Sequence, residues 1–95
     1  MVNALKSDVF ITGAARTPLG KFQGGLSTTA ATDLGATAIK AAIERSGIAP
    51  NEVEYTVMGN MLSAGLGQTP ARQAAIAAEI PNSVSALTIN KACAS

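Results

Sequence analysis

The chain has 95 residues, enough for one small domain. Hydrophobic residues make up 47% of it and charged residues only 14%, so the composition is that of a folded protein with much apolar surface to bury. The formal net charge is +1, and the scattered basic residues without interleaved aromatic side chains exclude a typical nucleic-acid binder. With one cysteine and no histidine, neither an internal disulfide nor a zinc site is expected.

The sequence gives no sign of a membrane or export signal. No apolar run is long enough to cross a bilayer, and the opening residues MVNALKSDVF lack both the apolar core of a signal peptide and the arginine-rich pattern of a transit peptide. The lone cysteine agrees with a reducing compartment. We therefore expect a cytoplasmic protein without a membrane partner, and mitochondrial and peroxisomal locations stay open as alternatives.

The first predicted element is a strand within residues 8–15, DVFITGAA, because a β-branched and aromatic run precedes Gly13. A loop rich in glycine and proline follows it. The stretch GAARTPLGK does not fit a phosphate-binding loop, because six residues separate Gly13 from Gly20 where that loop has four. A turn after the strand is the better interpretation.

A helix is predicted from Thr29 to Ser46, with Gly47 as the C′ residue that ends it. Its polar side chains share one face and its small and apolar residues share the other: Asp33, Thr37, Lys40 and Glu44 against Gly35, Ile39, Ala42 and Ile43. This pattern is typical of an amphipathic helix that packs closely on its neighbours.

Further elements follow as a strand at 55–60, a helix at 71–80 and a strand at 85–91. The order β-α-β-α-β predicts an α/β fold with parallel strands joined by right-handed crossovers. Crossovers that run in one direction place their helices on one face of the sheet. The other face is then expected to stay bare, although parallel sheets are normally covered on both faces.

The connection into the second helix carries its own signals. Thr69 is the expected N-cap, Pro70 the first helical residue, and Pro81 the stop. The stretch GNMLSAGLGQTPARQ before and into this helix is a long loop with three glycines. Such loops at the carboxyl ends of parallel strands often form sites, and a flexible connection is the equally open alternative.

Cys93 directly follows the predicted third strand. The dipole of a following helix would favour the thiolate there, which is the nucleophilic form of cysteine, and Lys91 is close in sequence. The alternative is an inert buried cysteine, since free cysteine is among the most buried residue types. No histidine is present in the chain to activate the thiol.

Four stretches together resemble the thiolase family: ARTPLGKFQGGLS, LGATAIKAAIERSGI, VEYTVMGNMLSAGLGQTPARQAA and TINKACAS. They occur in the family's order and at its separations from about Val9 to Ser95, and they are most similar to biosynthetic acetyl-CoA acetyltransferases. In the family motif NK-x-C-A/G-S-G, the cysteine is the nucleophile that becomes acylated. Cys93 occupies that position, and Ala92 stands where many members carry valine.

The resemblance implies a fold and an activity. Residues 1–95 would be the opening β-α-β-α-β part, with parallel strands, of a thiolase-like amino-terminal domain that is cut just after the nucleophile. The parent would be an acetyl-CoA C-acetyltransferase that condenses two acetyl-CoA into acetoacetyl-CoA and CoA through a cysteine acyl-enzyme. Cys93 is the one catalytic residue carried over. No cofactor-binding or metal-binding residue is implied, because the coenzyme A thioesters are substrates.

The resemblance also implies what these residues lack. Thiolases use a histidine to activate the nucleophile and a second cysteine as acid and base, in NEAF, GHP and C-x-G motifs that do not occur here. We therefore expect no turnover from the chain alone. The parent is expected to be a homo-oligomer, with the GLGQTPARQ loop and the strand before Cys93 at or near its dimer interface.

Two other interpretations of the chain stand beside an enzyme fragment. A non-enzymatic module that docks on a thiolase or on a complementary chain would explain the unfinished sheet and the large apolar fraction. A small flavodoxin-like binding domain explains the β-α order but leaves the four matching stretches unexplained.

Overall fold

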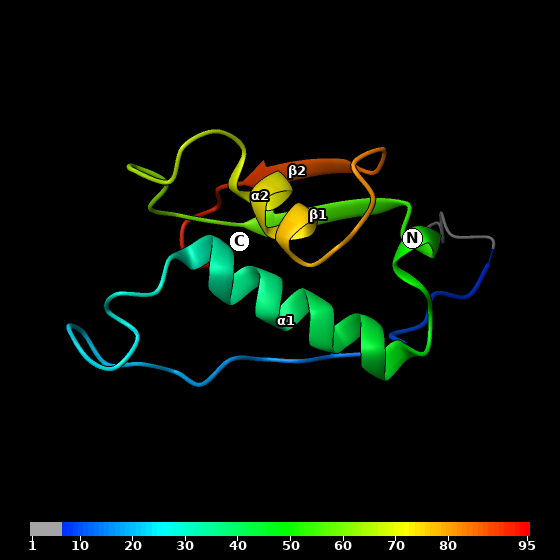
Figure 1. Cartoon of the computed structure of the whole chain (residues 1–95), viewed down its shortest axis with the longest axis horizontal. Coiled ribbons are helices and arrows are strands. Elements are labelled where there is room, and N and C mark those ends of the chain that lie inside the picture. Colours follow the sequence, from blue (N-terminus) through cyan, green and yellow to red (C-terminus); the bar gives the residue numbers. More distant parts are fainter. Residues whose placement is uncertain (1–6) are drawn as a thin grey trace, which may run out of the picture.

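The structure, a computed structural model, describes residues 7–95 and forms a two-stranded parallel sheet with helices against one face (Figure 1). The elements in chain order are the helix α1 (Ala31–Ser46), the 3-10 turn η1 (Pro50–Glu52), the strand β1 (Tyr55–Gly59), the helix α2 (Pro70–Ala77) and the strand β2 (Ser85–Ile89). The predicted α/β fold with parallel strands is confirmed. β2 ends two residues earlier than the sequence pattern indicated.

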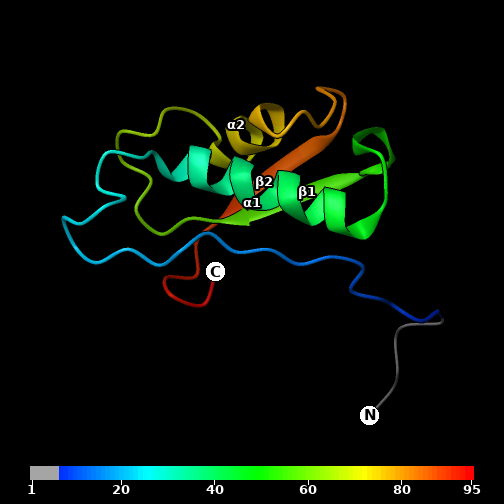
Figure 2. The ribbon, with the colours of Figure 1, turned by 60° about the horizontal axis from the view of Figure 1, so that its bottom comes forward.

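The two strands pair in a simple register from Tyr55 opposite Ser85 to Gly59 opposite Ile89. Successive side chains of a strand point to opposite faces, so alternate residues reach the helices. In β1, Thr56 is buried on the helix side. α2 contacts both strands and packs along α1, as the view in Figure 2 shows.

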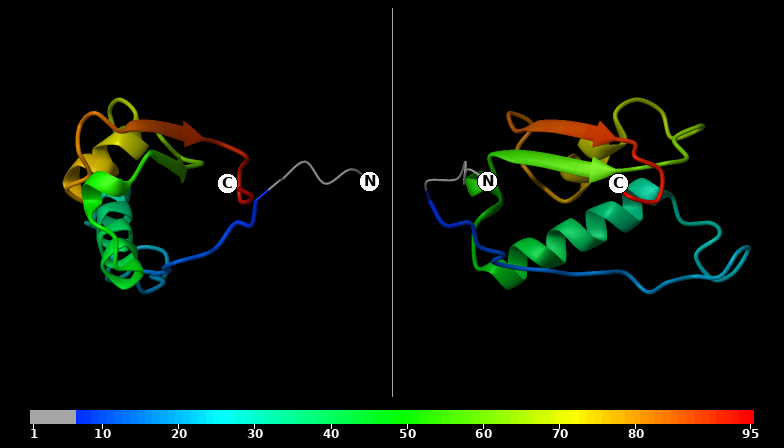
Figure 3. Two further views of the ribbon diagram at one scale, coloured as in Figure 1. Left: turned by 90° about the vertical axis from the view of Figure 1, so that its right-hand side faces the viewer. Right: turned by 180° about the vertical axis from the view of Figure 1, so that it is seen from behind.

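The other face of the sheet is bare. Tyr55 is 54% exposed, Val57 52% and Leu87 47%, although all three are large apolar or aromatic side chains. Seen from behind, both strands lie in front of the helices and no helix covers them (Figure 3, right). The element order predicted this one-sided sheet, because a single-direction series of crossovers keeps its helices on one side.

α1 follows its predicted two-faced pattern. The four polar side chains named for its outer face are exposed, and Gly35 on the opposite face is buried. The helix begins at Ala31, two residues after the predicted start. Gly47 ends it in the left-handed conformation with φ 74°, and its N–H donates to Glu44 O at 3.3 Å. Glycine adopts this conformation without the steric penalty of a Cβ atom.

Small residues make up the contact between the helices and the sheet. The buried apolar residues are nearly all alanine: Ala36, Ala71, Ala74, Ala75 and Ala78, with Ile80. A Cβ atom built on Gly35 would lie 3.0 Å from Met58 Cε and 3.2 Å from Ala74 Cβ, so α1, α2 and β1 meet at this glycine. Close approach of the backbones is what the small side chains permit.

The predicted first strand, residues 8–15, is wrong in this structure. The segment is extended but belongs to no ladder, and Val9, Phe10 and Ile11 are 76%, 76% and 92% exposed. It runs along α1 instead of beside β1 (Figures 1 and 3). Arg45 Nη1 donates to Ala14 O at 2.8 Å and fastens its end. A β-branched run becomes a strand only where a neighbouring edge supplies its hydrogen bonds, and within residues 7–95 none does.

α2 begins at Pro70 as predicted, but its amino-terminal end is not capped as predicted. Thr69 occupies the N-cap position but has φ 43° and makes no side-chain cap hydrogen bond. The N–H of Ala71 donates instead to Thr88 Oγ1 of β2, at 2.9 Å. A hydroxyl from the neighbouring strand thus replaces the local cap, which a search of the helix's own sequence misses.

α2 ends before Pro81 by a Schellman motif. Glu79 has φ 69°, its N–H donates to Ile76 O, and the Ile80 N–H donates to Ala75 O, both at 3.0 Å. These bonds satisfy carbonyls that the helix end leaves free. Pro81 therefore lies beyond a helix end that these backbone hydrogen bonds already define.

Thr56 and Thr88 point to the same side of neighbouring strands but differ in bonding, so threonine to valine is expected to act in opposite directions. Thr56 Oγ1 is buried without a hydrogen-bond partner among the described residues. Thr56→Val removes this hydroxyl and should raise the free energy of unfolding by about 1 kcal/mol. Thr88→Val should lower it by roughly 1–2 kcal/mol, because the buried Ala71 N–H loses its acceptor. Urea denaturation of both variants measures the two differences.

Thr88→Ser is the matched control for this pair, because it keeps the hydroxyl and should recover most of the stability that Thr88→Val loses. Shifts of the same sign in Thr56→Val and Thr88→Val would contradict the assigned hydrogen bonding.

Candidate functional site

The structure places Cys93 in the turn that follows β2. This last segment of the chain, drawn in red, leaves the carboxyl end of the sheet (Figure 1). The Cys93 thiol is free and the residue is exposed, so the alternative of an inert buried cysteine is wrong for this structure. Exposure makes the sulfur reachable by a substrate. No hydrogen bond or ion pair joins the Lys91 side chain to Cys93 within residues 7–95, so the lysine that is close in sequence does not hold the thiol.

The Cys93 turn, residues 91–95, consists of two overlapping backbone turns. The Ala94 N–H donates to Lys91 O at 3.0 Å and the Ser95 N–H to Ala92 O at 3.2 Å, and Ser95 Oγ donates to the same Ala92 carbonyl at 2.6 Å. Ala92, directly before the cysteine, has φ 49°. A residue other than glycine is uncommon in this left-handed region, so the hydrogen bonds of the turn hold a sparsely populated conformation.

Asn90 links the Cys93 turn to the loop after β1. Its Oδ1 accepts the Ala92 N–H at 2.9 Å, and its Nδ2 donates to Met61 O at 3.2 Å. Just before this point the Asn60 N–H donates to Ile89 O at 3.0 Å and extends the ladder by one bond. Sequence reasoning missed Asn90. The local signal was an asparagine directly before a tight turn, two residues before the N–H that its side chain accepts, a position typical of side-chain to backbone bonding.

Gly59, the last residue of β1, lies against the end of this turn. A Cβ atom built on Gly59 would collide with the carbonyl group of Ser95 and would lie 2.8 Å from Ser95 Cβ. The turn can fold back over β1 only because position 59 has no side chain. Gly59 is therefore a second residue that shapes the site without contributing chemistry.

The loop over residues 61–69 leaves the same end of the sheet as the Cys93 turn, and its first residue, Met61, accepts a hydrogen bond from Asn90 Nδ2. The loop is not a loose connection. Gln73 Nε2 donates to Leu66 O at 2.6 Å and to Gln68 O at 2.7 Å, so one side chain of α2 fastens the loop. Gly65 and Gly67 have φ 79° and 78°, a conformation that explains these two glycines.

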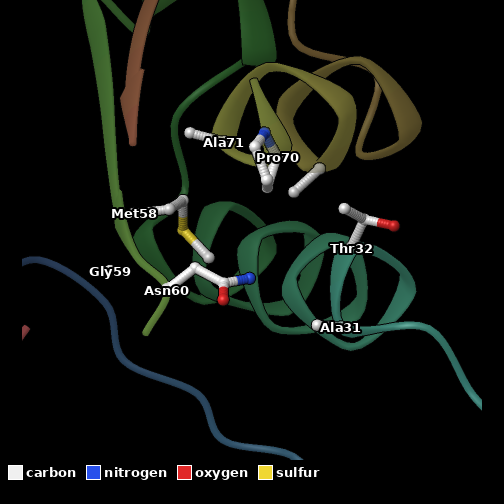
Figure 4. Close-up of a pocket in the computed structure, with 8 residues that line it drawn as sticks. Ala31, Thr32, Met58, Gly59, Asn60, Pro70 and Ala71 are labelled. Atoms are coloured by element: carbon white, nitrogen blue, oxygen red, sulfur yellow. The ribbon is translucent and has the colours of Figure 1, made fainter. Parts of the chain in front are cut away.

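A small cavity lies on the helix side of the carboxyl end of β1 (Figure 4). It has a volume of ≈ 70 Å³, Met58 extends into it from the strand, and the first residues of α1 and α2, Ala31 and Pro70, line it. Pockets for small-molecule ligands measure about 300–1,000 Å³, so this one is too small for an acyl-CoA. Cys93 is not part of its lining.

Across residues 7–95, no three histidine, cysteine, aspartate or glutamate side chains come together as a group that could hold a metal ion. Over the same described stretch, no helix combines the length and apolar character needed to cross a membrane.

The fold and the Cys93 turn define an α/β protein with a free thiol at the carboxyl end of a parallel sheet. Proteins with such sheets commonly bind their ligands at this end. The family model described as "Thiolase, N-terminal domain" matches residues 9–95. The chain therefore belongs to the thiolase family, as the four sequence stretches indicated.

Known relatives agree with this assignment. The chain is 54% identical over 87 residues to the cytosolic acetyl-CoA acetyltransferase ERG10 of Gibberella zeae, a match that covers 92% of this chain and 22% of that protein. It is 55% identical over 89 residues to the mitochondrial acetyl-CoA acetyltransferase of Xenopus tropicalis, covering 94% and 21%. The crystal structure of Acat5 thiolase from Ascaris suum in complex with coenzyme A superposes with a TM-score of 0.89 at 49% identity, covering 92% and 23%.

The chain spans about a fifth of the length of the relatives it matches. Similarity to them therefore establishes the family and the fold of these residues.

Gly59→Ala is expected to displace the Cys93 turn without touching the cysteine, because the new methyl group would collide with the Ser95 carbonyl. Backbone amide resonances of residues 91–95 should shift, while those of Ala74 and Ala75 in the core stay in place. Two-dimensional ¹⁵N–¹H NMR spectra of the two proteins make the comparison.

Gly25→Ala is the matched control, since a Cβ atom there would meet nothing within 4 Å. Unchanged resonances over 91–95 in Gly59→Ala would show that the turn does not rest on β1.

Proposed function

We propose that this chain is the amino-terminal part of an acetyl-CoA C-acetyltransferase and that Cys93 accepts the acyl group. One observation carries the proposal: the only cysteine of a thiolase-family chain is exposed on a tight turn at the carboxyl end of a parallel sheet. The relatives named above are acetyl-CoA acetyltransferases, and one solved relative holds coenzyme A.

The proposed first step is a transfer of the acetyl group between two thiols. The Cys93 sulfur, as thiolate, attacks the acetyl carbonyl carbon of acetyl-CoA, and the carbon–sulfur bond to coenzyme A breaks. Coenzyme A leaves as a thiolate and takes up the proton that the Cys93 thiol gave away. The product is a thioester on Cys93. The step needs no cofactor, because the coenzyme A thioester is itself the substrate.

In the proposed second step, the deprotonated methyl carbon of another acetyl-CoA attacks the carbonyl carbon of this thioester. The bond to the Cys93 sulfur breaks, acetoacetyl-CoA forms, and the released thiolate regains a proton. That step needs a base to remove a proton from the methyl group and donors to stabilise the developing oxyanion. The 95 residues contain no histidine and no second cysteine to act in these roles. A general base contributes about 10²- to 10⁴-fold, so the chain by itself is proposed to lack turnover.

The proposed setting is a homo-oligomeric parent enzyme that acts on acyl-CoA in the cytoplasm. Relatives carry both cytosolic and mitochondrial names, so the family alone does not choose the compartment. The bare sheet face with Tyr55, Val57 and Leu87 supports a parent in which further protein covers these residues.

A second candidate function is a non-enzymatic module that docks on a thiolase or on a complementary chain. The exposed apolar side chains favour it, since monomeric proteins rarely leave so many uncovered on one small domain. Light scattering with size-exclusion chromatography decides between the two. A complex with a separately produced thiolase supports docking. A monomer that does not bind the thiolase and that unfolds cooperatively on heating contradicts it.

The acyl-acceptor proposal predicts that acetyl-CoA acetylates the chain once, slowly, and on Cys93. Intact-mass spectrometry should show the gain of one acetyl group, and Cys93→Ser should show none, because an oxygen nucleophile without a base is far weaker. Thiolysis of acetoacetyl-CoA by free coenzyme A should stay at the level of the Cys93→Ser control.

Either of two results would contradict the assignment of Cys93 as the acyl acceptor of a chain that lacks turnover. Acetylation that persists in Cys93→Ser would move the acceptor to another residue, and multiple turnover at ordinary enzyme rates would show that the chain needs no further catalytic groups.

A further inference from the structure

Asn90 stands where the two segments that leave the sheet diverge. The Asn60 N–H to Ile89 O bond is the last ladder bond, after which one chain enters the loop over 61–69 and the other enters the Cys93 turn. Asn90 spans this divergence with one amide group, bonded to Met61 O on one side and to the Ala92 N–H on the other. We propose that Asn90 is the positioning residue for the Cys93 thiol, an inference that rests on the proposed role of that thiol as acyl acceptor.

The Cys93 turn needs such a residue because Ala92 is held in an unfavourable conformation. Its φ of 49° is costly for a residue with a Cβ atom. Its carbonyl accepts from the Ser95 N–H and Ser95 Oγ, and its N–H is satisfied by Asn90 Oδ1. Among the described residues, the asparagine is the only recorded acceptor for that N–H. Without it, the backbone before Cys93 loses the bond that opposes its relaxation.

The side chain at position 90 bonds two backbone groups of opposite kind. Met61 offers a carbonyl, which only accepts, and Ala92 offers an N–H, which only donates. A side chain that bonds both must therefore present a donor and an acceptor together. An ionised aspartate has acceptors alone, and alanine has neither. The two partners also fix which end of the amide carries the oxygen.

Asn90 would act by orientation and not by activation. An amide is neither a base nor an acid in the physiological range, and no bond joins it to the sulfur of Cys93. Its loss should therefore slow a reaction that depends on the direction of the thiol more than one that depends only on exposure. Acetyl transfer from acetyl-CoA is of the first kind, and alkylation by iodoacetamide is of the second.

Three variants of the chain test the inference: Asn90→Ala, Asn90→Asp and, as a control, Asn51→Ala. Asn51 is exposed in η1 and its side chain bonds to none of the described residues. The first measurement is hydrogen exchange of the Ala92 amide by NMR. In Asn90→Ala it should be about 3- to 10-fold faster, the loss expected for one hydrogen bond. Asn90→Asp keeps the acceptor and should stay within about 2-fold of the unaltered chain.

The second measurement compares two reactions of the sole cysteine. Asn90→Ala should lower the rate of acetylation by acetyl-CoA at least about 5-fold, while the rate of alkylation by iodoacetamide changes less than about 2-fold. Ala75 in α2 should keep its amide protection in every variant, which separates a local effect from general unfolding.

The outcomes are distinguishable. Unchanged Ala92 exchange in Asn90→Ala, equal acceleration in Asn90→Asp, or equal losses in both reactions of the thiol would each overturn the positioning role. If the unaltered chain is not acetylated at all, the proposed acyl-acceptor function fails. The exchange measurement then still decides whether Asn90 holds the turn.

Discussion

The parallel ladder between β1 and β2 is the constraint on which the remaining features depend. Parallel strands cannot be joined by a hairpin, so the chain must cross over through α2 and return to the same end of the sheet. Both carboxyl ends then meet at one edge. This brings Met61, at the start of the loop over 61–69, within hydrogen-bond reach of Asn90, although about 30 residues of chain separate Met61 from Ala92. The site is therefore a consequence of strand direction before any particular side chain is considered.

Close packing of small residues is what lets the crossover lie flat on the ladder, and it also limits stability. Gly35 and Ala74 allow α1 and α2 to approach β1 closely, but an alanine methyl contributes only about 0.8 kcal/mol when buried. Many of the larger apolar side chains lie outside this core: Val9, Phe10, Ile11, Tyr55, Val57 and Leu87 are all exposed. Much of the hydrophobic free energy that this composition could supply is thus not realised within residues 7–95.

Local sequence signals were sufficient where the deciding contacts are local. Gly47 ends α1 because the residue itself tolerates a positive φ, and both paired strands follow from short apolar runs. They failed where the partner is distant in sequence. Residues 8–15 have the composition of a strand but no ladder partner, and α2 is capped by Thr88, which comes 17 residues after the N–H it accepts. The position of Cys93 after a strand could be predicted from the sequence. The roles of Gly59 and Asn90 could not, because each depends on a contact with a residue that is distant in sequence.

Two opposing free-energy contributions of similar size, backbone strain and hydrogen bonding, determine the conformation of the Cys93 turn. A non-glycine residue in a sparsely populated conformation costs of order 1–3 kcal/mol, and a neutral hydrogen bond returns about 0.5–1.5 kcal/mol. Ala92 receives such bonds from Asn90 and Ser95, so a few neutral contacts decide its conformation. No charged side chain is bonded to this turn in the described residues. Under the proposed acyl-acceptor role, these contacts would set the direction of the thiol, and a base that activates it would have to approach from the exposed side of Cys93.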